Sequence, residues 1–210
     1  SHDKCLIMAT AKGTIKKIET NHFMNIRQRG IRAITLAEGD RLISVHIALE
    51  DDDAFIVTRN GQARRFGLKD IRAIGRAGMG VKGITLDEGD EVIDVDIVDD
   101  NEYLLVVSER GYGKKTLLEH YKAQGRGGKG LRTYKITKKT GPIVAALLVT
   151  KEDEVLLISK SNDIIRLETS SISTLGRTTS GVKLKDVKTE EGEIAAVAKY
   201  VEKYIDRQIE

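Results

Sequence analysis

The chain has 210 residues, of which 40% are hydrophobic, and its 35 basic and 32 acidic side chains give a formal net charge of +3. No apolar run approaches the ~18 residues of a membrane span, and the start of the sequence lacks a secretory signal, so we expect a cytoplasmic protein without a membrane partner. One cysteine, Cys5, and four scattered histidines exclude a disulfide framework and supply no set of metal ligands.

Four repeats fill the sequence. Gly30, Gly80, Gly130 and Gly181 lie 50, 50 and 51 residues apart, and each is followed by an apolar residue and then a base. A period near fifty residues is in the range of propeller blades. We therefore expect one domain over residues 1–200, with blades at approximately 1–50, 51–100, 101–151 and 152–200.

Each repeat begins with an apolar run, a turn signal and a second run that predict a β-hairpin. The apolar runs lie at residues 6–8, 55–57, 104–107 and 155–158. The turns are expected at Lys12-Gly13, Asn60-Gly61, Arg110-Gly111 and Ser161-Asn162. Glycine and asparagine tolerate the positive φ of a tight hairpin.

The returning strand carries adjacent bases in the first three repeats and one base in the fourth. These are Lys16 and Lys17, Arg64 and Arg65, Lys114 and Lys115, and finally Arg166. Neighbouring residues on a strand face opposite sides, so at most one base of each pair lies on a given face.

A short polar passage, too short for a long amphipathic helix, leads to the glycine marker in each repeat. Third strands are predicted after the markers, at residues 33–36, 83–86, 133–136 and 184–187. The fourth strand is clearest at residues 92–97, where polar and apolar residues alternate. The predicted fold is therefore all-β, a propeller-like array of four-stranded blades, and the spacing of Val201, Ile205 and Ile209 predicts a short helix in the tail 201–210.

The most basic glycine marker reads QGRGGKG and forms a box-like motif. Its residues are Gln124, Gly125, Arg126, Gly127, Gly128, Lys129 and Gly130. A dinucleotide fingerprint of this form needs a helix after it, whereas residues 131–136 resemble a strand. A phosphate loop needs Ser or Thr after its lysine. We therefore expect no cofactor and no catalytic residue.

The bases are sorted by segment, with a net charge of +6 over residues 59–82 and +9 over residues 110–139. If each blade shows its basic segment at the same edge, the repeats form a positive rim that suits a polyanion such as duplex DNA. The candidate DNA-binding residues are Lys16, Lys17, Arg32, Arg64, Arg65, Arg76, Lys82, Lys114, Lys115, Arg126, Lys129, Arg132, Arg166, Arg177 and Lys183. Few aromatic residues argue against a stacking platform for single strands. A propeller that binds protein partners is the alternative.

Three segments closely resemble the C-terminal DNA-wrapping domain of DNA gyrase A. They are Met8–Lys17, Gly111–Thr116 and Gly176–Val182. The resemblance implies a β-pinwheel, whose blades exchange strands and wrap duplex DNA without sequence specificity, so that the enzyme introduces negative supercoils. It implies as partners the rest of gyrase A together with gyrase B, in an A2B2 complex at the bacterial nucleoid. The related domain of topoisomerase IV, which directs substrate choice, is an alternative.

Two features of the sequence depart from that family. Its box reads Q-R-R-G-G-K-G in the first of usually six blades, whereas here Gly125 replaces the first arginine and the motif lies in the third repeat. The simplest interpretation is a fragment that lacks the first blades, and a natural four-bladed form is the other. The DNA-cleaving tyrosine and the ATPase of the family lie in other regions, so this chain alone is expected to be no enzyme, although part of an ATP-dependent type II topoisomerase.

Overall fold

The computed structural model describes residues 3–23, 29–75, 77–125 and 127–200. The chain is built from β-strands and short 3₁₀ turns, and it divides into two compact units. Unit 1 comprises Ser1–Asp99 and Tyr121–Leu131, and unit 2 comprises Asp100–His120 and Arg132–Glu210. The tail for which a helix is predicted, residues 201–210, lies outside the described residues, and no described helix is long and apolar enough to cross a membrane.

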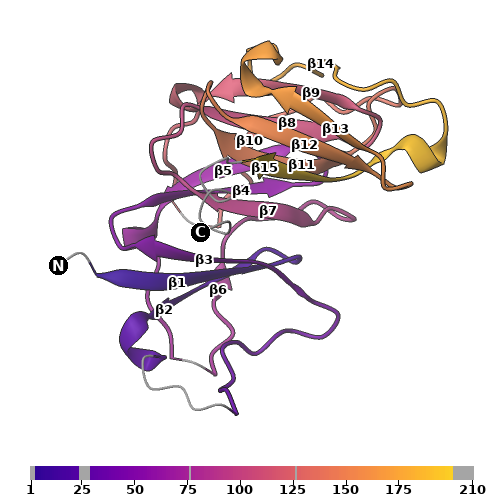
Figure 1. Ribbon diagram of the computed structural model, residues 1–210. Helices are drawn as coiled ribbons and strands as arrows, with labels where there is room; N and C mark the ends of the chain where they lie inside the picture. The colour runs from indigo at the N-terminus through magenta and orange to yellow at the C-terminus, as the bar shows by residue number, and fades with distance from the viewer. Residues whose placement is uncertain (1–2, 24–28, 76, 126, 201–210) are drawn as a thin grey trace, which may run out of the picture. The chain divides into compact units, whose positions relative to one another are not determined.

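Unit 1 contains two antiparallel sheets. The strands of the first are β1 (Lys4–Thr10), β2 (Thr14–Glu19), β3 (Leu42–Leu49) and β6 (Val81–Lys82), in the order β3-β1-β2-β6. Those of the second are β4 (Asp53–Thr58), β5 (Gln62–Gly67), β7 (Val92–Ile97) and β10 (Leu131–Arg132), in the order β10-β5-β4-β7. Within this unit β3 of one sheet lies next to β7 of the other (Figure 1).

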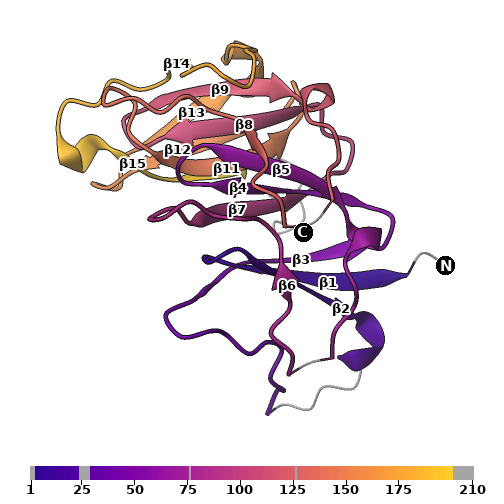
Figure 2. The same cartoon turned by 180° about the vertical axis from the view of Figure 1, so that it is seen from behind.

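Unit 2 contains the remaining strands. One sheet is formed by β8 (Tyr103–Ser108), β9 (Tyr112–Leu117), β11 (Ile143–Val149) and β14 (Val182–Lys183), in the order β11-β8-β9-β14. The other is formed by β12 (Glu154–Ser159), β13 (Ile164–Glu168) and β15 (Ile194–Tyr200), in the order β13-β12-β15. Figure 2 shows the short strand β14 along the edge of β9.

The hairpins form where the turn signals predict them. Gly13, between β1 and β2, has φ +92°, and Asn162, between β12 and β13, has φ +67°. The inward side chains of the hairpin strands form an apolar core in each unit. It includes Ile56 and Phe66 in unit 1, and Leu105 and Leu157 in unit 2. Each core consists of alternate residues from neighbouring strands, as the period of two requires.

Short 3₁₀ turns follow the hairpins in place of long helices. They are η1 (Thr20–His22), η2 (Leu68–Asp70), η3 (Leu118–His120) and η4 (Thr169–Ser171), and a fifth, η5 (Glu190–Gly192), precedes β15. Leu68 and Leu118 are buried, so the turns pack against the sheets.

In three of the sheets, one edge strand comes from the following repeat. These edge strands are β6, β10 and β14. The short strand β6 of the second repeat pairs with β2 of the first, with Ile15 opposite Val81. The short strand β14 of the fourth repeat pairs in the same way with β9 of the third, with Gly113 opposite Val182. This exchange of edge strands is the defining feature of a β-pinwheel, which confirms the predicted fold class.

The predicted third strands are wrong in position and length. Each described one has only two residues and ends before the predicted segment begins, as in β6 (Val81–Lys82), and residues 33–36 form no strand. The reason lies in the partners of the backbone amides. Gly83 donates to the Gly13 carbonyl and Thr85 donates to that of Gly128, at 2.7 and 3.0 Å. The segment thus contacts a hairpin turn and the next glycine marker, and it cannot join a regular ladder.

Candidate nucleic-acid interface

Five of the predicted DNA-binding side chains are buried. Lys16, Lys17, Arg64, Lys114 and Lys115 are at most 5% exposed. A buried cation is costly unless hydrogen-bonded, and these side chains all donate to backbone carbonyls. The expectation that these five lie on an exposed face is wrong, because both bases of the first and third pairs, and Arg64 of the second pair, are enclosed by the next repeat. We therefore leave them out of the proposed DNA-binding surface.

The first base of each pair holds the glycine marker of the following repeat. The Lys16 ammonium donates to the carbonyls of Ala33 and Gly78, at 2.7 and 2.8 Å. The Lys114 ammonium donates to the carbonyls of Gly176 and Arg177, at 2.6 and 3.0 Å. The contacts of Lys16 with Gly78 and of Lys114 with Gly176 and Arg177 join residues about sixty positions apart, so each cation links one repeat to the next.

Arg64 makes the corresponding contacts with the box-like motif. Its Nη1 donates to the Gly83 carbonyl, and its Nη2 donates to the carbonyls of Gln124, at 3.1 Å, and Gly125. The guanidinium carbon lies 5.0 Å from the centre of the Phe66 ring. An arginine from the second repeat thus positions the first residues of QGRGGKG.

The second base of each pair bonds either to a carbonyl of the 3₁₀ turn in the next repeat or to a carboxylate of its own hairpin. Lys17 Nζ donates to the Leu68 carbonyl at 3.0 Å, and Lys115 Nζ donates to the Thr169 carbonyl at 2.8 Å. Arg65 instead forms an ion pair with Asp53 at 2.9 Å and remains half-buried. None of these three places its charge fully in solvent.

Burial lowers the pKa values of three of these lysines. Removal of the Lys114 side chain from water, together with the charge of Arg177, lowers the pKa of Lys114 to about 8. Burial also lowers the pKa of Lys16 and of Lys115. The depressed pKa values are typical of cations within the protein, where desolvation disfavours the charged form.

The box-like motif forms an exposed loop with one exposed charge among its described residues. Lys129 Nζ lies 3.0 Å from Asp87 Oδ1, and more than half of both side chains is exposed. Gly130 has φ +81°, and a Cβ there would approach the Ala63 carbonyl oxygen to 2.5 Å. Gly125 has open space around its Cβ position and no such constraint. Arg126 lies outside the described residues, as does Arg76 of the second repeat.

One base is exposed at the same place in every repeat. It follows the marker glycine by two positions and is Arg32, Lys82, Arg132 or Lys183. Three of these bases lie on the exchanged edge strands β6, β10 and β14, where the preceding apolar residue is more buried or pairs with the partner strand. Strand exchange therefore turns one base toward solvent in the second, third and fourth repeats, and Arg32 of the first repeat is exposed without lying on a strand.

The remaining candidates have partners within their own unit. Arg166 is exposed, bonds to Glu154 and packs against Tyr200 with 4.4 Å between its guanidinium carbon and the ring centre. Arg177 is half-buried and donates to the Arg132 carbonyl at 3.2 Å. Arg32 and Lys82, which are exposed, are the better candidates for phosphate contact.

Sequence reasoning counted Arg110, Lys138 and Lys139 in the charge of residues 110–139 but did not name them as site residues, and they line a cavity in unit 2 with Lys183. The signal was present, because Lys138-Lys139-Thr140-Gly141 stands where the first two repeats have the acidic turns Glu38-Gly39-Asp40 and Glu88-Gly89-Asp90. In the part of the chain that the structure describes, no group of three His, Cys, Asp or Glu side chains could hold a metal.

The exchanged strands and the repeated exposed base define the chain as a β-pinwheel, a propeller-like repeat protein. The family model described as the DNA gyrase C-terminal domain, beta-propeller, matches residues 6–48, 52–99, 102–150 and 153–199. The chain belongs to this family. The four matched segments correspond to the four repeats.

Curated relatives and solved structures agree with the family. The chain is 55% identical over 181 residues to the DNA gyrase A protein of Streptococcus pyogenes serotype M3, and 51% identical over 200 residues to that of Halalkalibacterium halodurans. These alignments cover 86% and 95% of this chain but only 22% and 24% of the relatives. The chain thus spans less than a quarter of their length.

Two solved structures have the same fold. One, titled "Structure of DNA gyrase A C-terminal domain", has a TM-score of 0.86 and 32% identity, with 96% of this chain and 67% of that chain covered. The C-terminal domain of DNA topoisomerase IV has a TM-score of 0.88 at 22% identity, with 99% and 68% covered. At that identity the second similarity shows the fold alone.

Proposed function

We propose that this chain binds duplex DNA without sequence preference, bends it and wraps it, and so supports negative supercoiling by DNA gyrase. The observation that carries the proposal is the exposed base that recurs two positions after each marker glycine, at Arg32, Lys82, Arg132 and Lys183. A repeated exposed base suits a ligand with a repeated charge, and duplex DNA carries one phosphate per ~1.7 Å of its axis.

The proposed contact surface consists of the predicted bases that are not enclosed by the next repeat. Its described members are Arg32, Arg65, Lys82, Lys129, Arg132, Arg166, Arg177 and Lys183. Arg76 and Arg126 stay predictions from the sequence. Each neutralised phosphate releases about 0.9 counterion, so six to ten contacts offset the cost of bending, about 1–6 kcal/mol, only at low salt.

The chain acts within a larger assembly in this proposal. DNA cleavage and ATP hydrolysis belong to the remainder of gyrase A and to gyrase B, in an A2B2 complex in the cytoplasm at the nucleoid. Gyrase is preferred over topoisomerase IV because relatives at 33–55% identity are gyrase A proteins, whereas the topoisomerase IV domain is similar at only 22% identity.

The test is the affinity of the 210-residue chain for a fluorescent duplex of about 30 base pairs, measured between 50 and 200 mM salt. We expect a nanomolar-to-micromolar dissociation constant that rises steeply with salt and does not depend on sequence. A flat salt response, or binding of protein partners without DNA binding, would instead favour a protein-interaction module.

A further inference from the structure

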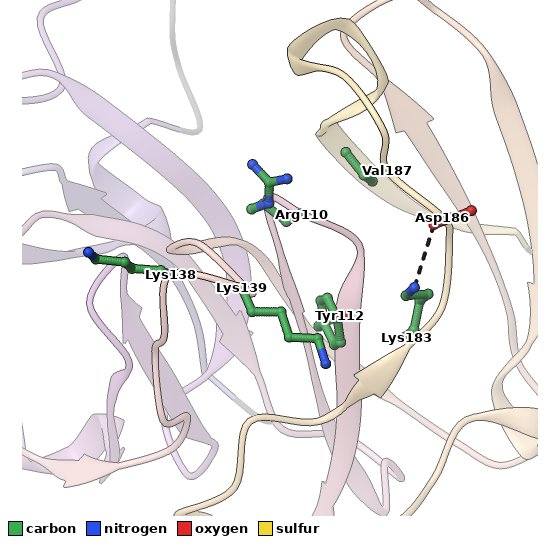
Figure 3. A pocket seen from close by; sticks show the side chains of 7 residues that line it. All are labelled: Arg110, Tyr112, Lys138, Lys139, Lys183, Asp186 and Val187. Atoms are coloured by element: carbon green, nitrogen blue, oxygen red, sulfur yellow. Dashed lines mark hydrogen bonds and ion pairs between the residues drawn. The ribbon is translucent and has the colours of Figure 1, made fainter.

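A basic cavity lies in unit 2 at the tip of the β8–β9 hairpin. It has a volume of about 330 Å³ and is lined by Arg110 and Tyr112 of the hairpin, Lys138 and Lys139 of the turn before β11, Lys183 of β14, and the nearby Asp186 (Figure 3). Four cations thus share this cavity with one carboxylate. The exchanged strand of the fourth repeat supplies Lys183, so two repeats contribute to it.

The cations around the cavity are only weakly neutralised. Lys183 Nζ lies 3.5 Å from Asp186 Oδ1, at the long end for an ion pair, and Lys139 Nζ lies 5.4 Å from the centre of the Tyr112 ring. In Figure 3 Lys139 reaches toward the Tyr112 ring, the Lys183 ammonium points toward Asp186 on the other side of that ring, and Lys138 points away. Tyr112 therefore lies between the two lysines, both of which line the cavity.

In the first two repeats, the turn that corresponds to residues 138–141 carries an aspartate, Asp40 or Asp90. The Lys12 amide, at the tip of the β1–β2 hairpin, donates to Asp40 Oδ1 at 2.9 Å, and the Asn60 amide, at the tip of the β4–β5 hairpin, donates to Asp90 Oδ1 at 3.0 Å. In the third repeat the Arg110 amide donates instead to the Thr140 backbone carbonyl at 3.0 Å. The carboxylate that accepts a hydrogen bond from the amide at each of the other two hairpin tips is therefore absent from this turn.

The acid nearest to Arg110 in its own hairpin does not supply the missing charge to the cavity. Glu109, beside Arg110, lies 3.2 Å from Lys160, which also forms an ion pair with Glu193 at 2.9 Å. The nearest acid of the hairpin is therefore committed to a lysine that does not line the cavity.

We propose that this cavity binds a phosphate group, which takes the place of the aspartate of the other repeats and is held by Arg110, Lys139 and Lys183. The chemistry of a doubly or singly charged oxyanion suits a guanidinium with two ammonium groups. The phosphate comes from the backbone of bound duplex or from a free polyphosphate. The first source rests on the proposed function, and the second does not.

The experiment compares two double variants of the 210-residue chain that lose the same charge. Lys139→Ala with Lys183→Ala removes two cavity lysines, and Lys4→Ala with Lys151→Ala removes two exposed lysines elsewhere. One arm measures how duplex affinity depends on salt, and the other measures inorganic pyrophosphate binding by calorimetry. A further variant, Lys139→Asp, returns an acid to the turn. Melting temperatures establish that each variant is folded.

If duplex is the source, the cavity variants reduce the slope of log affinity against log salt by about 0.9 for the lost phosphate, relative to the control pair. If free polyphosphate is the source, they lose pyrophosphate binding that the control pair retains, even where the chain binds no DNA. The proposal is overturned if cavity and control variants behave alike in both arms. Duplex binding by the unmodified chain would then still stand.

Discussion

The guanidinium of Arg64, on the return strand of the second repeat, donates to the backbone carbonyl of Gln124, the first residue of the box-like motif, at 3.1 Å. Lys16 and Lys114 make the equivalent contact with the second and fourth repeats. The most basic pairs in the sequence therefore join repeats, and the residues that face solvent are less conspicuous bases beside the marker glycines.

Removing the Arg64 charge should destabilise the fold. The Arg64→Leu variant leaves the carbonyls of Gly83, Gln124 and Gly125 without this donor, and we expect the free energy of unfolding to fall by about 2–4 kcal/mol. Urea unfolding followed by circular dichroism measures this change. Lys69→Ala, which removes an exposed cation of the same repeat, should leave the midpoint nearly unchanged. Equal effects of the two variants would disprove the linking role of Arg64.

Restoring the arginine that the family's box has at position 125 should strengthen DNA binding. Gly125 has open space at its Cβ position, so Gly125→Arg should fold normally. We expect tighter duplex binding and a salt slope steeper by about 0.9. The matched control is Gly75→Arg, at the equivalent position of the second repeat, where the Cβ position is also open but Met79 stands in place of Lys129. An effect no larger at position 125 than at position 75 would argue against a special role for the box-like motif.

Lys129 is paired with Asp87 and must leave that carboxylate to meet a phosphate. The Asp87→Asn variant should therefore bind duplex about 1.5- to 5-fold more tightly, the range expected for release of one surface ion pair. Asp51→Asn makes the same charge change at the exposed Lys69 pair and serves as the control. Fluorescence anisotropy measures the duplex affinity of both variants. If both gain affinity equally, the gain comes from the change in net charge and not from the release of Lys129.

The buried ammonium of Lys114 predicts a pH dependence of stability. Its pKa is about 8 in the folded chain and near its usual 10.5 when unfolded. Between these values the unfolded chain holds a proton that the folded chain has released, so stability rises with pH, by at most about 1.4 kcal/mol per unit. Below pH 8 Lys114 is protonated in both the folded and the unfolded chain, so its contribution to the free energy of unfolding stays constant at its least favourable value.

Comparison with Lys114→Met isolates this effect, since other titrating groups are common to both proteins. The stability of the unmodified chain relative to the variant should increase from pH 8 to pH 10.5. Denaturant unfolding at several pH values measures it. Parallel stability curves for the two proteins would show that Lys114 keeps an ordinary pKa.

Local chemistry made the repeat, the hairpins and the fold class predictable. Gly13 and Asn162 mark turns because few other residues adopt their positive φ, and the fifty-residue period is visible in the sequence itself. The positions of the third strands were not predictable, because Gly83 and Thr85 bond to residues far away in sequence. Their amides follow the exchange of strands between repeats, which no local pattern reveals.

Whether a base is buried or exposed also depends on contacts with residues far away in sequence. A lysine is ordinarily exposed, so Lys16 and Lys114 were expected at the surface, and only the structure shows the carbonyls, about sixty residues away, that enclose them. Lys138 and Lys139 were counted in the basic segment 110–139 but were not singled out as site residues, for the opposite reason. Their importance lies in the acid that the turn lacks, which becomes visible only when the four repeats are compared.

DNA wrapping is tested most directly by the linking number of a circle closed around the protein. Nicked circular DNA is sealed by ligase with increasing amounts of the 210-residue chain at low salt, and the topoisomers are separated on a gel. If the chain wraps duplex, the topoisomer distribution shifts in one direction with added protein and returns at high salt, as the electrostatic contacts are screened. A distribution that stays at the protein-free position while the DNA is bound would contradict the proposed function.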